Sequence, residues 1–134
     1  MKYLLDSNII IDFFRGKQGL KEKIIERLRQ GFGVGSIGLA ELYRGAFKSD
    51  RVKFNLRLIK NLLNLPEVKM VVFGKNEALA AGDLAARLEQ KGQKLSVGDT
   101  LIAATAKANN LTILTEDKKH FGRLTKFGIK VETV

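Results

Sequence analysis

The stretch MKYLLDSNIIIDFFRG, residues 1–16, predicts the opening strand and helix of an α/β fold. Its short apolar run at residues 3–5 is typical of a buried strand. The small polar residues 6–8 then end that strand and can begin a helix, which the apolar residues at 9–11 and 13–14 indicate. Because ligands of open α/β sheets lie beyond the carboxyl ends of the strands, we expect Asp6 at the mouth of a crevice. The simpler alternative is that this aspartate, or the serine after it, only caps the helix.

The composition predicts one globular, cytoplasmic domain with a polyanionic partner. The 134 residues are 45% apolar, so we expect a single domain over residues 1–134. Cysteine is absent, which excludes disulfides and thiolate metal sites and fits a cytoplasmic protein. No run is apolar over the roughly 18 residues that a membrane helix needs, and no secretory pattern is visible. Lys and Arg outnumber Asp and Glu by 24 to 14, and the net charge of +10 favours nucleic acid over a membrane as partner, solubility being the weaker explanation.

Helix and strand patterns alternate along the rest of the chain. Apolar residues recur at helical spacing in some segments and form short β-branched runs in others. The helical segments are residues 20–30, 36–47 (with Ser36 as the expected cap), 51–64, 76–91 and a segment that is apolar nearly all round at 101–106; the strand-like segments are residues 32–35, 68–73, 111–114 and 129–134. This alternation favours an α/β fold whose mostly parallel sheet is covered by helices on both faces.

Four acids take corresponding places in this pattern. Asp6 and Asp117 follow predicted strands, while Glu41 and Asp99 lie near the starts of predicted helices. In a parallel sheet all four can converge at one edge, and because clustered carboxylates repel, a cation should lie among them. With no Cys and a single His, an oxygen-only site points to Mg²⁺ or Mn²⁺ rather than zinc. Such a metal on a basic protein favours phosphodiester hydrolysis, in which it polarises the phosphate and lowers the pKa of an attacking water.

Each acid also has a structural interpretation. Asp99 follows Ser96 in the S-x-x-D pattern of a capping box, and Asp117 can cap the short basic segment after it. Glu41 is harder to explain in this way, because it lies too far inside its helix to cap it and a buried acid without a partner is costly. His120 is expected to be a surface or phosphate-contacting residue rather than a metal ligand or a base.

Four motifs, in order and at matching spacing over nearly the whole chain, resemble the PIN domain and, more narrowly, the VapC-type toxins of bacterial and archaeal toxin–antitoxin pairs. They are L-L-D-S-N at residues 4–8, S-x-x-x-x-E at 36–41, G-D-T-L-I-A-A-T-A at 98–106 and L-T-E-D-K-K-H-F at 114–121. The resemblance implies a PIN-like three-layer α/β/α sandwich with a mostly parallel central sheet. It also implies a ribonuclease that depends on Mg²⁺ or Mn²⁺, is restrained by a cognate VapB-type antitoxin and forms a homodimer.

The resemblance also assigns roles to individual residues. The catalytic and metal-binding acids are Asp6, Glu41, Asp99 and Asp117, Ser7 is the site hydroxyl, and Asn8 and Thr115 are supporting residues. The last acid is open to an alternative, because Glu116 is adjacent and the family varies there. Arg44, which follows Glu41 by three residues, and Lys118 with Lys119, beside the last acid, are candidates for binding RNA.

Two other functions are compatible with parts of the sequence. A phosphatase of the haloacid dehalogenase type also begins with a strand that ends in Asp, but it needs a second Asp two residues later, where this chain has Asn8. A non-catalytic RNA-binding module would explain the charge, but it would leave Glu41 and the other acids without a purpose. It also lacks an aromatic platform for stacking bases, because the chain has no Trp and most Phe residues lie in apolar runs.

Overall fold

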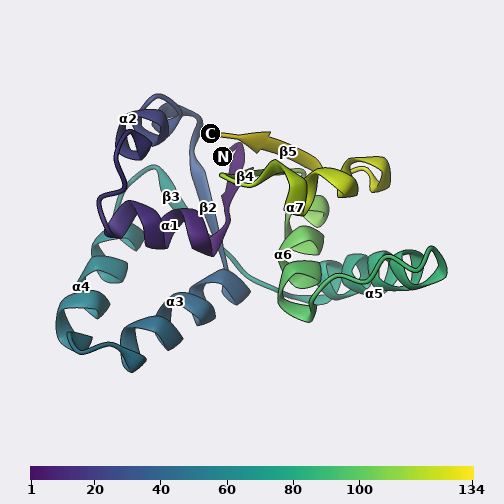
Figure 1. Ribbon diagram of the computed structural model, residues 1–134, viewed down its shortest axis with the longest axis horizontal. Helices are drawn as coiled ribbons and strands as arrows, with labels where there is room; N and C mark the ends of the chain where they lie inside the picture. Colours follow the sequence, from purple (N-terminus) through teal and green to yellow (C-terminus); the bar gives the residue numbers. More distant parts are fainter.

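The structure, a computed structural model, covers residues 1–134 and describes every side chain except that of Lys118 (Figure 1). Lys118, a candidate for binding RNA, therefore lies outside the described side chains. The elements in chain order are β1 (Tyr3–Leu5), α1 (Ser7–Phe14), α2 (Leu20–Ile25), η1 (Leu28–Gln30), β2 (Phe32–Gly35), α3 (Ser36–Lys48), α4 (Val52–Leu63), β3 (Val68–Val71), α5 (Lys75–Gln90), α6 (Val97–Ala108), β4 (Thr112–Thr115), α7 (Lys118–Gly122), η2 (Arg123–Phe127) and β5 (Lys130–Thr133). In the part of the chain that the structure describes, no helix is long and apolar enough to cross a membrane.

The five strands form one sheet in the order β3-β2-β1-β4-β5, and every neighbouring pair is parallel. The prediction of a mostly parallel sheet is therefore confirmed. In the register of the central pair, Leu5 of β1 lies opposite Leu114 of β4. The residues that follow these two strands consequently leave the sheet at the same edge.

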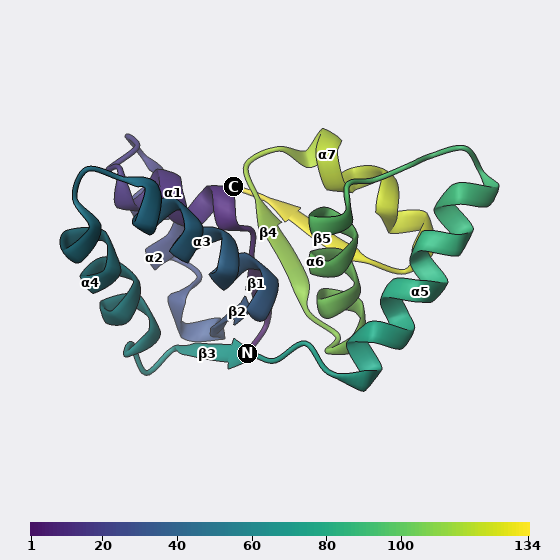
Figure 2. The same ribbon diagram turned by 90° about the horizontal axis from the view of Figure 1, so that it is seen from below.

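Helices cover both faces of the sheet, as the α/β/α prediction requires. Figures 1 and 2 show the strands between α1–α4 on one side and α5, α6 and α7 on the other. The alternation within β1 explains the two layers, because successive side chains of a strand point to opposite faces. Tyr3 and Leu5 belong to the core under α1–α4, and Leu4 belongs to the core under α5–α7.

The buried helix that was expected around residues 101–106 is α6. Ala103, Ala104 and Ala106 are completely buried, and such small side chains allow the helix to lie close against the sheet. Since α6 leads directly into β4 and crosses the sheet in the opposite direction, its first turn lies at the carboxyl edge of the strands. This places Asp99 at the same edge as the ends of β1 and β4.

The prediction of one helix over residues 20–30 is wrong beyond Ile25, where α2 ends and a turn leads into η1. A tertiary contact explains the break. Arg27 donates through Nη1 to the carbonyl oxygen of Lys23 at 2.6 Å and through Nε to Glu132 at 2.6 Å. Glu132 lies on β5 at the edge of the sheet, so this contact fixes a turn that local periodicity does not reveal. The strand predicted at residues 68–73 is also shorter and ends at Val71.

Candidate active site

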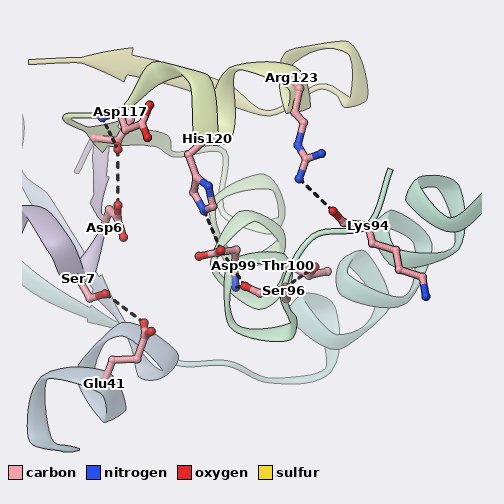
Figure 3. A network of polar contacts seen from close by, with 11 residues as sticks. Asp6, Ser7, Glu41, Lys94, Ser96, Asp99, Thr100, Asp117, His120 and Arg123 are labelled. Carbon is pink, nitrogen blue, oxygen red and sulfur yellow. Dashed lines mark hydrogen bonds and ion pairs between the residues drawn. The ribbon is translucent and has the colours of Figure 1, made fainter. Parts of the chain in front are cut away.

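The polar side chains predicted from the sequence lie at the carboxyl edge of the sheet. The backbone N–H of Asp6 donates to the carbonyl oxygen of Leu114 at 3.3 Å, so the end of β1 is fastened to β4. Figure 3 shows Asp6 and Asp117 on one side of a common space, with Glu41 and Asp99 coming from α3 and α6. Segments that are distant in the sequence therefore contribute acids to one region.

Asp6 is the most buried of the four acids, with 6% of its surface exposed. Burial is the main cause that raises the pKa of Asp6, and the charges of Asp99 and Glu41 raise it further. The backbone N–H of Asn8 and the nearby His120 act in the opposite direction. The hydroxyl of Thr115 donates only a long hydrogen bond to Asp6, at 3.5 Å. Asp6 is thus a desolvated carboxylate on which the charges of two other carboxylates, Asp99 and Glu41, act.

Glu41 projects from α3 and is held by Ser7. The Ser7 hydroxyl, buried at the start of α1, donates to Oε1 of Glu41 at 3.1 Å. The expectation that Glu41 is buried is wrong, because its face of α3 is exposed to solvent. Ser36 does not cap α3 either: Gly35 is the cap residue, and the Ser36 hydroxyl accepts a hydrogen bond from the backbone N–H of Phe73 at 3.1 Å.

Asp99 has both the capping and the site position that the sequence allowed. Its backbone N–H donates to the Ser96 hydroxyl at 3.2 Å, which is the capping contact. Its Oδ2 accepts a hydrogen bond from the same hydroxyl at 2.7 Å and lies 2.7 Å from Nε2 of His120. The charge of Asp99 also raises the pKa of Asp6. Asp99 therefore lies close to Asp6 even though it takes part in the capping contact of α6.

Asp117 and Glu116 point to different partners. Asp117 caps α7 by accepting from the backbone N–H of Lys119 at 3.0 Å, and its own N–H donates to the Thr115 hydroxyl at 3.2 Å. Glu116 instead forms an ion pair with Lys17 at 3.0 Å. Burial and a hydrogen bond with Asp12 raise the pKa of Glu116, while Lys17 lowers it.

The remaining candidates are exposed residues around the acids. Asn8 lies in the first turn of α1, Arg44 on α3 and Lys119 on α7, and all three are exposed to solvent. The contact of His120 with Asp99 was not predicted from the sequence. The available signal was its position three residues after Asp117, which places both at the start of one short helix.

The donor set of the site fits a hard divalent cation. No Lys or Arg in the described part of the chain forms an ion pair with the four acids, although they include the buried Asp6. Carboxylate and hydroxyl oxygens are the ligands that Mg²⁺ and Mn²⁺ prefer. Within the described residues, no three Asp, Glu or His side chains lie close enough together to hold one ion. In this structure each of the four acids accepts a hydrogen bond from a hydroxyl, an imidazole or a backbone N–H.

The chain matches the family model for the PIN domain over residues 3–126. It is 30% identical over 127 residues to Ribonuclease VapC2 of Haemophilus influenzae, covering 92% of both chains. It is also 30% identical to the tRNA(fMet)-specific endonuclease VapC of Salmonella typhimurium, over 98% of this chain and 97% of that one.

Solved structures agree with these relatives. VapBC2 from Rickettsia felis, bound to a DNA fragment from their promoter, superposes with a TM-score of 0.88 at 27% identity, over 100% of this chain and 99% of that chain. VapBC-1 from nontypeable Haemophilus influenzae superposes with a TM-score of 0.85 at 28% identity, over 99% and 98% of the two chains. The sequence-based prediction of a PIN-like α/β/α fold is confirmed.

The burial of Asp6 predicts that Asp6→Asn melts at the same temperature as the wild type or higher, at pH 7 in excess chelator. A raised folded-state pKa contributes stability that is full below the ordinary value of 3.8 and is lost as pH rises through the raised pKa. At pH 7 the wild type lacks this contribution to stability. The neutral Asn removes the repulsion between Asp6 and the carboxylates of Asp99 and Glu41. Each kcal/mol gained corresponds to roughly 3–5 °C for a chain of this size. The difference in melting temperature between Asp6→Asn and the wild type should become smaller as pH falls toward 4. Calorimetry or circular dichroism measures both melting temperatures.

Asp83→Asn is the matched control for this experiment. Asp83 lies on α5, its side chain is 48% exposed, and it pairs with Arg87 at 3.1 Å. Its replacement should not reproduce the pH dependence. An Asp6→Asn variant that melts clearly below the wild type at pH 7 would show that the Asp6 charge is not a destabilising feature of the fold.

Proposed function

The chain belongs to the PIN-domain family, among the VapC ribonucleases, and on this premise we propose that it is a metal-dependent endoribonuclease that acts as the toxin of a toxin–antitoxin pair. The observation that carries the proposal is the environment of Asp6. This carboxylate is 6% exposed and lies among other acids that raise its pKa. Burying a charge without a cationic partner is costly, so the arrangement is explained by a function that brings a cation to it.

We propose that Asp6, Glu41, Asp99 and Asp117 hold Mg²⁺ or Mn²⁺. When bound, the metal would polarise the phosphate of the RNA and lower the pKa of an attacking water. Ser7 orients Glu41 through the hydrogen bond at 3.1 Å. Thr115 supports both sides of the region, because its hydroxyl donates to Asp6 and accepts from the backbone of Asp117. Asn8 supports Asp6 through its backbone N–H, which lowers the Asp6 pKa.

For the last acid we propose Asp117 rather than Glu116. The ion pair between Glu116 and Lys17 at 3.0 Å already supplies a cation to that carboxylate. Among the described residues, the Asp117 carboxylate accepts a hydrogen bond only from the backbone N–H of Lys119, and Asp117 is linked to Asp6 through the hydroxyl of Thr115. Asp117 is therefore the acid with oxygen atoms available to a metal.

The RNA path is proposed to run over Arg44 and Lys119 (with Lys118 as a further candidate), next to the acids. Arg44 follows Glu41 by less than one helical turn on α3, and Lys119 lies in the first turn of α7, two residues after Asp117. Both are exposed, and they belong to a chain of net charge +10. Cationic side chains beside a metal site can hold the phosphates that flank the cleaved bond.

The partner is proposed to be a cognate VapB-type antitoxin. Solved structures similar to this chain are toxin–antitoxin complexes, among them VapBC-1 of Haemophilus influenzae. On this chain, an apolar groove lies between α1, α2 and α4 and is lined by residues that include Ile9, Phe13, Ile25 and Leu65. We propose that the antitoxin lays apolar residues in a groove of this kind and places a basic side chain among the acids. We further propose a homodimer and action in the cytoplasm, where an RNA substrate is available.

The first prediction of this function is RNA cleavage that requires a divalent metal. Incubation of the purified chain with mixed RNAs should give internal cuts with Mg²⁺ or Mn²⁺ and none in excess chelator. Asp6→Asn and Glu41→Gln should each lower the rate by at least about 100-fold, the scale on which losing one group that stabilises a transition state lowers kcat. Sequencing of the fragments would identify the RNA and the cut site.

Asp83→Asn is again the control and should cleave at the wild-type rate. Cleavage that continues undiminished in excess chelator would refute the metal mechanism. Binding of RNA without any cleavage would favour the non-catalytic RNA-binding module. Hydrolysis of small phosphate monoesters without RNA cleavage would favour the phosphatase.

The second prediction concerns the basic residues. In an Asp6→Asn background, which separates binding from cleavage, RNA affinity should fall steeply with salt. Replacing Arg44 or Lys119 with Ala should each reduce the slope of log K against log[salt] by about 0.7–0.9, because each neutralised phosphate releases counterions. Fluorescence anisotropy with labelled RNA measures the slope.

Lys130→Ala is the matched control for charge removal. Lys130 lies at the amino end of β5, on the opposite edge of the sheet from the acids, and donates to Asn110. For Lys130→Ala, the slope of log K against log[salt] should equal that of the Asp6→Asn protein from which it is made. Slopes that are equal for all three variants would mean that Arg44 and Lys119 do not contact phosphates.

A further inference from the structure

His120 joins two parts of the site that come from distant segments of the chain. Its Nε2 lies 2.7 Å from Oδ2 of Asp99, 21 residues away in the sequence (Figure 3). An ionised carboxylate can only accept hydrogen bonds, so Nε2 carries the proton and donates. The neutral imidazole is sufficient for this bond.

The same oxygen of Asp99 has a second donor. The Ser96 hydroxyl donates to Oδ2 at 2.7 Å and accepts the Asp99 backbone N–H at 3.2 Å. Among the described residues, no hydrogen bond reaches the other oxygen, Oδ1. In Figure 3 the Asp99 carboxylate lies at the space that Asp6 and Glu41 also border. Two donors therefore hold one oxygen, and the other remains free on the side of the acids.

Neither helix capping nor fold stability explains the contact from His120. The cap of α6 is complete without it, because Ser96 already accepts the N–H of Asp99. The side chains of His120 and Asp99 are 43% and 25% exposed, and pairs that solvent reaches in this way contribute little to stability. The contact from His120 can instead fix the orientation of the Asp99 carboxylate.

His120 is itself held firmly enough for this task. The next residue, Phe121, is completely buried, and its ring meets the imidazole edge-on with centroids 4.8 Å apart. Asp117 caps the helix that carries both. Just beyond α7, Nη2 of Arg123 donates to the carbonyl oxygen of Lys94 at 3.1 Å, which joins this region a second time to the segment before α6.

We propose that His120 is a positioning residue that, together with Ser96, holds Oδ2 of Asp99 and leaves Oδ1 to bind the metal. This inference rests on the proposed function, because it assigns His120 a role at the same metal site. Carboxylates that bind metals are commonly held by such outer hydrogen bonds, and losing one costs about 10–100-fold in metal affinity. A carboxylate held by two donors also loses less rotamer freedom when the metal binds.

The test measures the binding of Mn²⁺ alone. The electron paramagnetic resonance signal of the free ion reports how much Mn²⁺ remains unbound. His120→Ala should raise the Kd for Mn²⁺ by about 10–100-fold relative to the wild type. His120→Gln, whose amide N–H can donate to Oδ2, should restore the affinity to within a few-fold. Both variants should melt near the wild-type temperature in chelator, and Lys130→Ala should bind Mn²⁺ as the wild type does.

The possible outcomes distinguish a failure of the positioning role of His120 from a failure of the proposed metal mechanism. An affinity of His120→Ala equal to or tighter than that of the wild type would overturn the positioning role. Equal losses in His120→Ala and His120→Gln, with unchanged melting, would also overturn it and make the imidazole a direct ligand. If the wild type itself binds no Mn²⁺, the proposed metal mechanism fails, and the inference fails with it.

Discussion

The repulsion among carboxylates at the end of a parallel sheet is the constraint on which the site depends. Asp6 is forced into this position because it follows a buried strand in the centre of the sheet, and burial raises its pKa before any neighbour acts on it. Parallel topology brings the ends of β1 and β4 to the same edge, so an acid after β4 lies near an acid after β1. Stability alone does not favour such an arrangement, and sites of this kind commonly trade stability for function.

The protein reduces this repulsion by giving individual acids local donors. Asp99 and Asp117 accept from groups at the starts of α6 and α7, where unpaired N–H groups and the helix dipole favour negative charge. Glu41 accepts from the hydroxyl of Ser7. A capping role and a site role are therefore compatible, because the helix starts that need caps lie at the edge where the acids meet. Asp6 accepts a long hydrogen bond from the Thr115 hydroxyl, and the backbone N–H of Asn8 also favours its charged form, but burial outweighs these contacts and its pKa stays raised.

Much of the fold could be predicted from the sequence because its local signals agree with the tertiary structure. The apolar run before Asp6, the buried stretch around Ala103 and the alternation of elements all reappear in the sheet and its two layers. The break after Ile25 could not be predicted, because it depends on Arg27 meeting Glu132 across the fold. The exposure of Glu41 and the contact between His120 and Asp99 were missed for the same reason: side-chain direction and distant pairing are not encoded in spacing along one segment.

The proposed metal site depends on Asp6 being a desolvated carboxylate whose charge a divalent cation compensates. Its carboxyl carbon can be titrated directly by NMR in isotopically labelled protein, first in chelator and then with increasing Mg²⁺. We expect the midpoint of this titration to lie above 3.8 without metal and to move to lower pH as Mg²⁺ is added, because the cation favours the charged form. A midpoint at or below 3.8 in chelator would show that Asp6 is not a desolvated carboxylate, and a midpoint that Mg²⁺ does not move would show that no cation binds beside it.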